Sequence, residues 1–202
     1  INKIIFLGSL LSNVKKQLLY EPVLYSGEIK NIIKLPKLKS ENNVFFNKLF
    51  GYRDNTLYHF HKFIYLGVPL YGLKDLMVNP NESPDDLEKK CKIIIKNAMK
   101  VLSENKFIYR PHPIENIDKD FYKDNCKFDI LNNMWEIECQ NTITDNHILV
   151  SFFSTAAFTP KILYGKEPYV VVLYNMLGVE FFNADKLVSN MKSLYSNPEK
   201  VI

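Results

Sequence analysis

The chain has 202 residues, of which 47% are hydrophobic and 24% are charged, proportions that are typical of a folded domain and exclude a disordered chain. A net charge of +4 suits an anionic small molecule or an acidic surface, but the lysines are scattered, so no nucleic-acid-binding stripe is expected. No apolar run approaches the roughly 18 residues that a membrane-spanning helix needs.

The cysteines indicate the redox compartment of the protein, and the first residue indicates how the chain relates to the full-length protein. Cys91, Cys126 and Cys139 are an odd number and lack the CxxC spacing of a metal site. We therefore expect unpaired thiols in a reducing cytosol. The chain starts at Ile1 rather than at a methionine, so we expect a fragment, or the ordered part, of a longer protein.

The first predicted element is a strand over residues 3–8, which a helix follows through about Leu19. Residues 21–55 give mixed signals because prolines interrupt any long helix. A turn cluster over 51–55 marks a candidate boundary. We therefore divide the chain into a partial amino-terminal lobe or linker over 1–62 and a carboxyl-terminal lobe over 63–202.

The second lobe is predicted to alternate strands with helices. After a strand over 63–69, Ser83, Pro84 and Asp86 form a capping box, with Asp in place of Glu, for an amphipathic helix that ends near Asn105. The later elements are strands over 107–109 and 128–131, a short helix over 135–140, a strand over 148–153, a helix over 155–164 closed by Gly165, a strand over 169–173 and a helix over 185–195. This alternation predicts an α/β fold with a parallel sheet and helices on both faces.

His112 lies between Pro111 and Pro113 at the end of an apolar run, so the backbone there is extended and stiff. A histidine can donate a proton to a leaving group or pair with a phosphate oxygen. The alternative is a turn histidine that caps the sheet, and the sequence leaves both interpretations open.

A second polar turn follows the apolar run 148–153, where Ser154 and Thr155 precede two alanines. Their hydroxyls and the first N–H groups of the next helix can receive a phosphate, whereas the alternative is plain N-capping by Ser154. Ligands of open α/β sheets bind at the carboxyl ends of the strands. We therefore expect His112 and Ser154 to face one cleft.

Other polar residues favour structural interpretations. Asp118 and Asp120 match an Asp-x-Asp pattern of metal–nucleotide sites, but no buried strand precedes them directly and a solvated loop is expected. His59 and His61 alternate with aromatic residues; a metal pair is conceivable, but the sequence offers no evident third ligand. His147 is expected at the surface.

The run Tyr109-Arg-Pro-His-Pro113, followed by Ser151-Phe-Phe-Ser-Thr-Ala-Ala157, resembles the His-Pro and Ser-Ser/Thr motifs of bacterial sialyltransferases. It is most similar to glycosyltransferase family 52, which includes lipooligosaccharide and capsule sialyltransferases. The strand over 63–69 also resembles that family's first strand in its nucleotide lobe. The resemblance covers roughly 63–174, about half of the chain.

The resemblance implies a GT-B-like architecture, with a Rossmann-type parallel sheet as the nucleotide-binding lobe and an incomplete or reduced amino-terminal lobe over 1–62. It implies inverting, metal-independent transfer of sialic acid from CMP-sialic acid, without a cofactor, to a lipooligosaccharide or capsule glycan. The implied location is the cytoplasm, including the inner face of the membrane. Peripheral membrane association and a homodimer both stay open.

The resemblance also assigns roles to residues of the two motifs. His112 takes the role of general acid, and Ser154 and Thr155 bind the departing phosphate. Pro113 and Gly67 are assigned to nucleotide binding.

Two further roles need a carboxylate. Glu138, or failing it Glu136, matches the acidic residue between the motifs that contacts the nucleoside. The base is the poorest match. We prefer Asp75, because a loop carboxylate reaches an acceptor hydroxyl more readily than one that starts a helix, and Asp85 and Asp86 are the alternatives.

Two other functions stay open at this stage. One is another GT-B glycosyltransferase, or a polysialyl or capsule polymerase, that uses a different nucleotide sugar. The other is a nucleotide-binding module without catalytic activity.

Overall fold

The computed structural model describes residues 16–24, 31–69, 77, 83–101, 107–115, 126–181 and 183–202. The chain divides into two compact units, Ile1–Lys37 and Leu38–Ile202. The strand expected over 3–8 lies outside the described residues. The helix expected through about Leu19 is wrong at its described end, where Gln17–Leu19 form a strand that pairs with residues 32–34. Among the helices of the described ranges, none is long and apolar enough to cross a membrane.

The first unit contains a short parallel pair of strands, β1 (Gln17–Leu19) and β2 (Ile32–Lys34), with the 3₁₀ helix η2 (Pro22–Leu24) between them in sequence. Glu21 pairs with Lys34 at 3.2 Å and with Lys37. Burial alone would raise the pKa of Glu21, but these two lysines lower it. The charged pairs thus hold the segment after β2 to the segment after β1.

The second unit is built on a five-stranded parallel sheet in the order β5-β4-β3-β6-β7. The strands are β3 (Phe63–Leu66), β4 (Phe107–Arg110), β5 (Cys126–Phe128), β6 (Ile148–Ser151) and β7 (Tyr169–Val172). The chain runs outward from β3 to β5 and then returns to the other side of β3 with β6. This order is Rossmann-like, and its topological switch point lies between β3 and β6.

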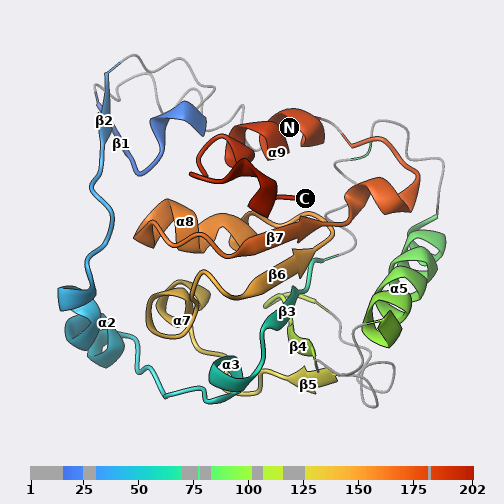
Figure 1. Cartoon of the computed structure of the whole chain (residues 1–202), viewed down its shortest axis with the longest axis horizontal. Helices are drawn as coiled ribbons and strands as arrows, with labels where there is room; N and C mark the ends of the chain where they lie inside the picture. Colours follow the sequence, from blue (N-terminus) through green and yellow to red (C-terminus); the bar gives the residue numbers. More distant parts are fainter. Residues whose placement is uncertain are drawn as a thin grey trace. The chain divides into compact units, whose positions relative to one another are not determined.

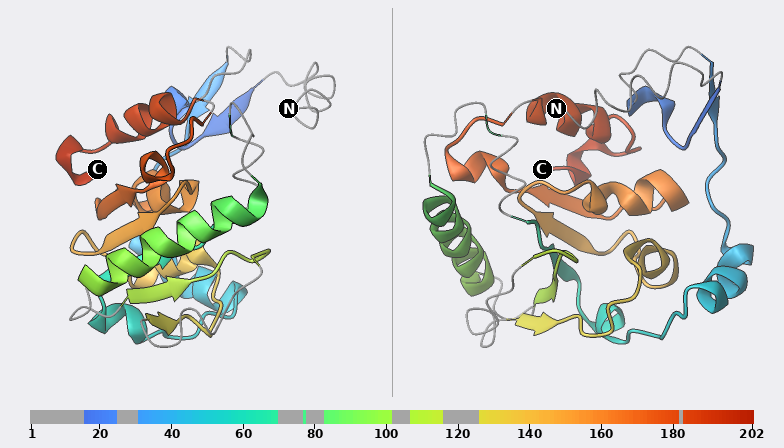
Figure 2. Two further views of the ribbon diagram at one scale, coloured as in Figure 1. Left: turned by 90° about the vertical axis from the view of Figure 1, so that its right-hand side faces the viewer. Right: turned by 180° about the vertical axis from the view of Figure 1, so that it is seen from behind.

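Helices cover both faces of this sheet (Figures 1 and 2). The α-helices are α2 (Asn43–Leu49), α3 (Leu57–Phe60), α5 (Pro84–Val101), α7 (Trp135–Asn141), α8 (Thr159–Tyr164) and α9 (Ala184–Lys192). The 3₁₀ helices are η3 (Ser40–Asn42), η4 (Thr155–Phe158), η5 (Tyr174–Leu177) and η6 (Pro198–Lys200). Figure 1 shows α5 on one side of the sheet and α7 with α8 on the other. The α/β fold and the parallel sheet that the sequence predicts are confirmed.

Helix α5 follows the local signals closely. The backbone N–H of Asp86 donates to Ser83 Oγ at 3.1 Å, so Ser83 caps the helix as predicted. The Asp86 carboxylate accepts the Ser83 hydroxyl at 2.7 Å, so the two residues of the predicted capping box bond to each other. The buried stripe of the helix is Leu87, Cys91, Ile95 and Met99. It packs in one core cluster with side chains of β3, β4 and β6. The four-residue spacing of the stripe is what one apolar helix face requires.

The second unit begins before the boundary that we expected at residue 63. Asn47 of α2 exchanges two side-chain amide hydrogen bonds with Asn141 of α7, at 3.0 and 2.8 Å. Tyr58 of α3 is buried and donates to Asp129 at 2.8 Å. These contacts make residues 38–62 part of the unit that holds the sheet.

Two elements differ from their predicted form. The helix expected over 155–164 is η4 followed by α8, because Pro160 lies in the first turn of α8 and has no N–H to continue the hydrogen-bond ladder of an α-helix. Gly165 closes α8 with a φ of 73°, as predicted. The strand expected over 128–131 is β5 at Cys126–Phe128. The N–H of Asp129 still donates to the carbonyl oxygen of Tyr109 on β4 at 3.0 Å, while its side chain joins a buried hydrogen-bond network.

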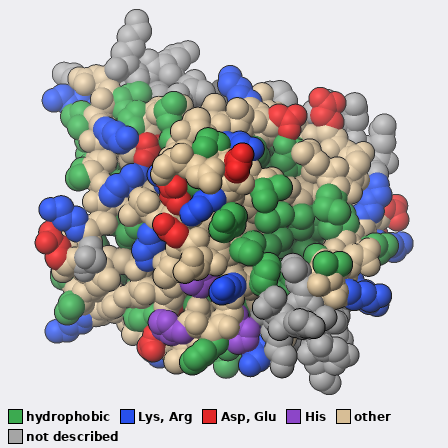
Figure 3. Space-filling view, in the orientation of Figure 1, with side chains coloured by type: hydrophobic (Ala, Val, Ile, Leu, Met, Phe, Trp, Pro, Cys, Tyr) green, Lys and Arg blue, Asp and Glu red, His purple; other side chains and the backbone are tan. Residues whose placement is uncertain are grey.

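The cysteines and the charged side chains were expected to form neither a disulfide framework nor a basic stripe. Cys91, Cys126 and Cys139 form no disulfide bond. Burial raises the pKa of the Cys91 and Cys126 thiols to about 12. Over the residues that Figure 3 colours, Lys and Arg side chains have Asp and Glu side chains among them, so this face carries no continuous basic stripe.

Candidate functional site

A pocket of about 440 Å³ opens at the carboxyl ends of β3 and β4, next to the turn that follows β6. This is the edge of the sheet where ligands of doubly wound α/β proteins bind. The volume falls in the range of small-molecule sites, about 300–1,000 Å³. The lining residues are Leu66, Gly67, Arg110, Pro111, His112, Pro113, Asn132, Asn133, Met134, Trp135, Glu136, Ser154 and Ala156.

His112 reaches the pocket from the turn after β4. It follows Arg110, the last residue of the strand, and is flanked by two prolines that stiffen the backbone. The imidazole Nδ1 accepts the backbone N–H of Ile114 at 3.4 Å. In the neutral ring this contact places the proton on Nε2, which is then a donor to a ligand.

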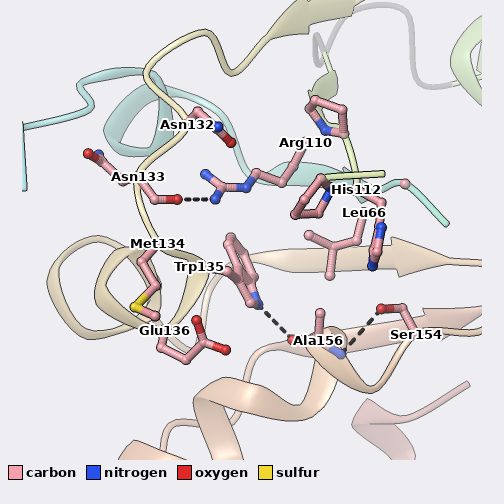
Figure 4. Close-up of a pocket in the computed structure, with 13 residues that line it drawn as sticks. Leu66, Arg110, His112, Asn132, Asn133, Met134, Trp135, Glu136, Ser154 and Ala156 are labelled. Atoms are coloured by element: carbon pink, nitrogen blue, oxygen red, sulfur yellow. Dashed lines mark hydrogen bonds between the residues drawn. The ribbon is translucent and has the colours of Figure 1, made fainter. Parts of the chain in front are cut away.

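Ser154 reaches the same pocket from the turn after β6. Its backbone is extended, and its Oγ accepts the N–H of Ala156 at 3.3 Å, so it also caps η4. In Figure 4 the side chains of His112 and Ser154 lie on one side of the pocket and Glu136 lies on the other. The structure therefore brings His112 and Ser154 to one cleft, as the sequence analysis expects.

Trp135 ties the two halves of the pocket together. Its Nε1 donates to the carbonyl oxygen of Ala156 at 2.8 Å, which joins the first residue of α7 to η4. The guanidinium of Arg110 lies over the indole ring, 5.6 Å from its centroid. The wall made by β4, α7 and η4 is thus held by a hydrogen bond and a cation–π contact.

Beneath this wall lies a buried network centred on Asp129. The carboxylate pairs with Arg110 and accepts hydrogen bonds from Asn55 and Tyr58, both at 2.8 Å. Burial alone would lower the pKa of Arg110, but its interactions with Tyr58 and Asp129 raise it. The guanidinium also donates to the carbonyl of Asn133, so the network fixes the loop that forms one side of the pocket.

The two candidate nucleoside carboxylates lie in different environments. Glu138, our first choice, is 0% exposed and accepts hydrogen bonds from Asn133 at 2.8 Å and Thr142 at 2.9 Å. Burial raises the pKa of the Glu138 carboxyl, although these two hydrogen bonds act the other way. Glu136 is exposed and lines the pocket. The geometry therefore favours Glu136 over Glu138 for contact with a ligand.

The remaining expected site residues are only partly brought together. Gly67 and Pro113 line the pocket. Thr155 is exposed and lines a separate small cavity instead. Asp85 and Asp86 lie in the first turn of α5 and do not line the pocket.

Asp75, the preferred base, lies outside the described residues. The Asp-x-Asp pair Asp118 and Asp120 lies outside them too.

The histidines outside the pocket have structural partners. His147 is buried, not at the surface as expected: its Nδ1 accepts the N–H of Thr144 at 3.0 Å, and its Nε2 lies 2.9 Å from the carbonyl oxygen of Tyr58. His61 Nδ1 lies 2.9 Å from the carbonyl oxygen of Leu57, and His59 lies 3.4 Å from Asp54. Within the described part of the chain, no group of three or more His, Cys, Asp or Glu side chains could hold a metal ion.

Sequence reasoning missed the residues that build the pocket wall. The sequence contained a signal for Arg110 and Trp135. Arg110 is a charged side chain at the end of an apolar run, and Trp135 is the single tryptophan of the chain; when buried, each needs a polar partner. Asn132 carries a weaker signal. It adopts a φ of 49°, a conformation that asparagine tolerates better than most residues.

The fold and the site define an α/β protein with a Rossmann-like sheet and a ligand-sized pocket at its switch point. No protein-family model and no curated protein matches the sequence.

Proposed function

We propose that this chain carries the nucleotide-sugar site of a metal-independent sialyltransferase that transfers sialic acid from CMP-sialic acid to a glycan acceptor. In this proposal the unit that holds the sheet, residues 38–202, is the nucleotide lobe of a GT-B-like enzyme. The observation that carries it is the shared pocket of His112 and Ser154 at the switch point of the sheet. Parallel sheets bind nucleotides at this position, and the two residues belong to the motifs that resemble those of sialyltransferases.

In the proposed reaction an acceptor hydroxyl oxygen bonds to the anomeric carbon of sialic acid and gives its proton to a carboxylate base, the role for which the sequence analysis prefers Asp75. The bond between that carbon and the CMP phosphate oxygen breaks at the same time. Negative charge grows on that phosphate oxygen. The His112 side chain, held by the stiff Pro111–Pro113 turn, donates a hydrogen bond there from Nε2–H of the neutral ring, or a proton when the ring is the imidazolium. Donors already aimed at developing charge need little rearrangement in the transition state.

The rest of the pocket supports binding rather than proton transfer to the phosphate. Ser154 Oγ uses a lone pair on the Ala156 N–H, which leaves its own proton for a phosphate oxygen. Arg110 is committed to Asp129 and Asn133. Among the described residues, Glu136 is the carboxylate that lines the pocket. In this proposal it accepts hydrogen bonds from the hydroxyl groups of the ribose or the sugar.

Calorimetric titration with CMP and with UDP tests the binding step. Ser154→Ala should weaken CMP binding about ten- to hundredfold, because a hydrogen bond to a charged group is worth about 1.5–3 kcal/mol. Thr155→Ala is the matched control, since that hydroxyl lines a different cavity. Equal CMP affinity in the wild type and both variants, with intact folding, would reduce Ser154 to a helix cap.

Turnover of CMP-sialic acid tests the catalytic step. His112→Ala should lower kcat by about 10²–10⁴, the usual contribution of general-acid help. His112→Gln should recover only part of the loss, because an amide donates a hydrogen bond but no proton. Donor binding should change less than kcat, since the contact strengthens in the transition state. A near wild-type kcat for His112→Ala refutes the role.

A second candidate is a nucleotide-binding module without turnover. It is favoured by the placement of Asp85 and Asp86, two of the three candidate bases, away from the pocket on the exposed first turn of α5. Tight CMP binding without release of sialic acid, in the presence of glycan acceptors, would support this second function. Preference for UDP would instead indicate a different nucleotide sugar.

A further inference from the structure

Residues 112–115 form a turn that closes on itself. The backbone N–H of Glu115 donates to the carbonyl oxygen of His112 at 2.9 Å, and the backbone N–H of His112 donates to Glu115 Oε2 at 3.0 Å. The side chain of Glu115 therefore returns to the residue that carries the imidazole. A carboxylate that accepts a backbone N–H makes a stronger bond than a neutral acceptor does.

The same carboxylate occupies the space beside Gly67, the residue after β3. A Cβ atom on Gly67 would lie 2.0 Å from Glu115 Oε2 and 3.0 Å from the backbone nitrogen of His112. The Gly67 N–H also donates to the carbonyl oxygen of Arg110 at 2.8 Å, so its backbone is fixed against β4. A side chain at position 67 therefore requires Glu115 Oε2, the atom that accepts the His112 N–H, to move.

We propose that Glu115 is a positioning residue for His112, and that Gly67 is a glycine because the Glu115 carboxylate needs its space. Glu115 does not line the pocket, so it acts on a ligand only through the turn that it closes. Gly67 then has a role that the resemblance did not assign, since its missing side chain makes room for Glu115 rather than for a nucleotide.

The geometric part of this inference is independent of the reaction, whereas its effect on turnover depends on the proposed sialyl transfer. Two readouts separate them. The imidazole signals of His112 in ¹H–¹⁵N NMR report the orientation and surroundings of the ring. Steady-state transfer from CMP-sialic acid reports kcat and the donor KM.

Glu115→Ala should shift the imidazole signals and lower kcat about 10- to 100-fold, the loss expected when a reacting group is misplaced by about 1 Å. The donor KM should change less, since Glu115 makes no contact in the pocket. Glu115→Gln should keep the imidazole signals and kcat close to their wild-type values, because its amide oxygen still accepts the His112 N–H. Glu88→Ala is the matched control, for its carboxylate pairs with Lys92 at 2.8 Å on α5.

Gly67→Ala gives an independent arm, because it displaces the carboxylate without removing it. Gly67→Ala should reproduce the shift of the imidazole signals and the loss of kcat that Glu115→Ala causes. Both changes should be smaller when Gly67→Ala is made in the Glu115→Ala variant than when it is made in the wild type. Wild-type imidazole signals in Glu115→Ala, or fully additive effects of the two substitutions, would overturn the inference. A wild-type protein that transfers no sialic acid would refute the proposed function. The imidazole signals of the two single variants and of the double variant would still test the positioning of His112.

Discussion

Replacement of Asp129 by alanine should be among the most destabilising single substitutions in this protein. The carboxylate is fully buried, pairs with Arg110, and accepts hydrogen bonds from Asn55 and Tyr58 at 2.8 Å and from the N–H of Leu131 at 3.2 Å. Asp129→Ala leaves the Arg110 charge buried without its partner. Breaking a buried ion pair in this way costs about 3–5 kcal/mol. In a domain of this size the loss lowers Tm by roughly 6–20 °C.

Urea and thermal unfolding followed by circular dichroism measure this loss directly. Asp129→Asn should cost less than Asp129→Ala, because the amide oxygen still accepts one of the hydrogen bonds. Glu41→Ala is the control: its ion pair with Lys39, at 3.6 Å, joins side chains that are 71% and 74% exposed. Such a pair contributes about 0–1 kcal/mol. A loss below about 1 kcal/mol for Asp129→Ala, equal to this control, would refute the reasoning about the buried network.

Two further predictions concern stability. Burial alone would raise the pKa of Glu167, but hydrogen bonds from Lys161 and Ser196 lower it from 4.5 to about 2. The ionised carboxylate thus stabilises the fold above pH 4.5, and this stabilisation is lost as the pH falls from 4.5 toward 2. Its upper limit is about 3 kcal/mol, which screening by solvent reduces. Glu167→Gln should flatten that acid limb in urea titrations; an unchanged limb contradicts the assignment. Ser83→Ala should cost about 1 kcal/mol of unfolding free energy, whereas Ser83→Asp should retain the cap; equal stabilities would exclude a capping role.

Local sequence determined much of the second unit. The Ser83 capping box and the four-residue repeat of apolar side chains after it specified α5, because both signals act between residues within one or two helical turns. The apolar runs that became β4 and β6 ended in polar turns, and parallel strands bring their carboxyl ends to one edge. That rule was enough to predict that His112 and Ser154 share a cleft.

Tertiary structure decided which polar side chains are buried. Asp129 and His147 each have a partner on α3 or beside it, more than 70 positions earlier in the chain. Glu136 and Glu138 are two positions apart on α7, so the helix turns one toward the pocket and the other into the network with Asn133. Gly67 and Glu115 meet only because β3 and β4 pair in register. Patterns along the chain determine helices and strands, whereas contacts between distant segments depend on packing that no local pattern encodes.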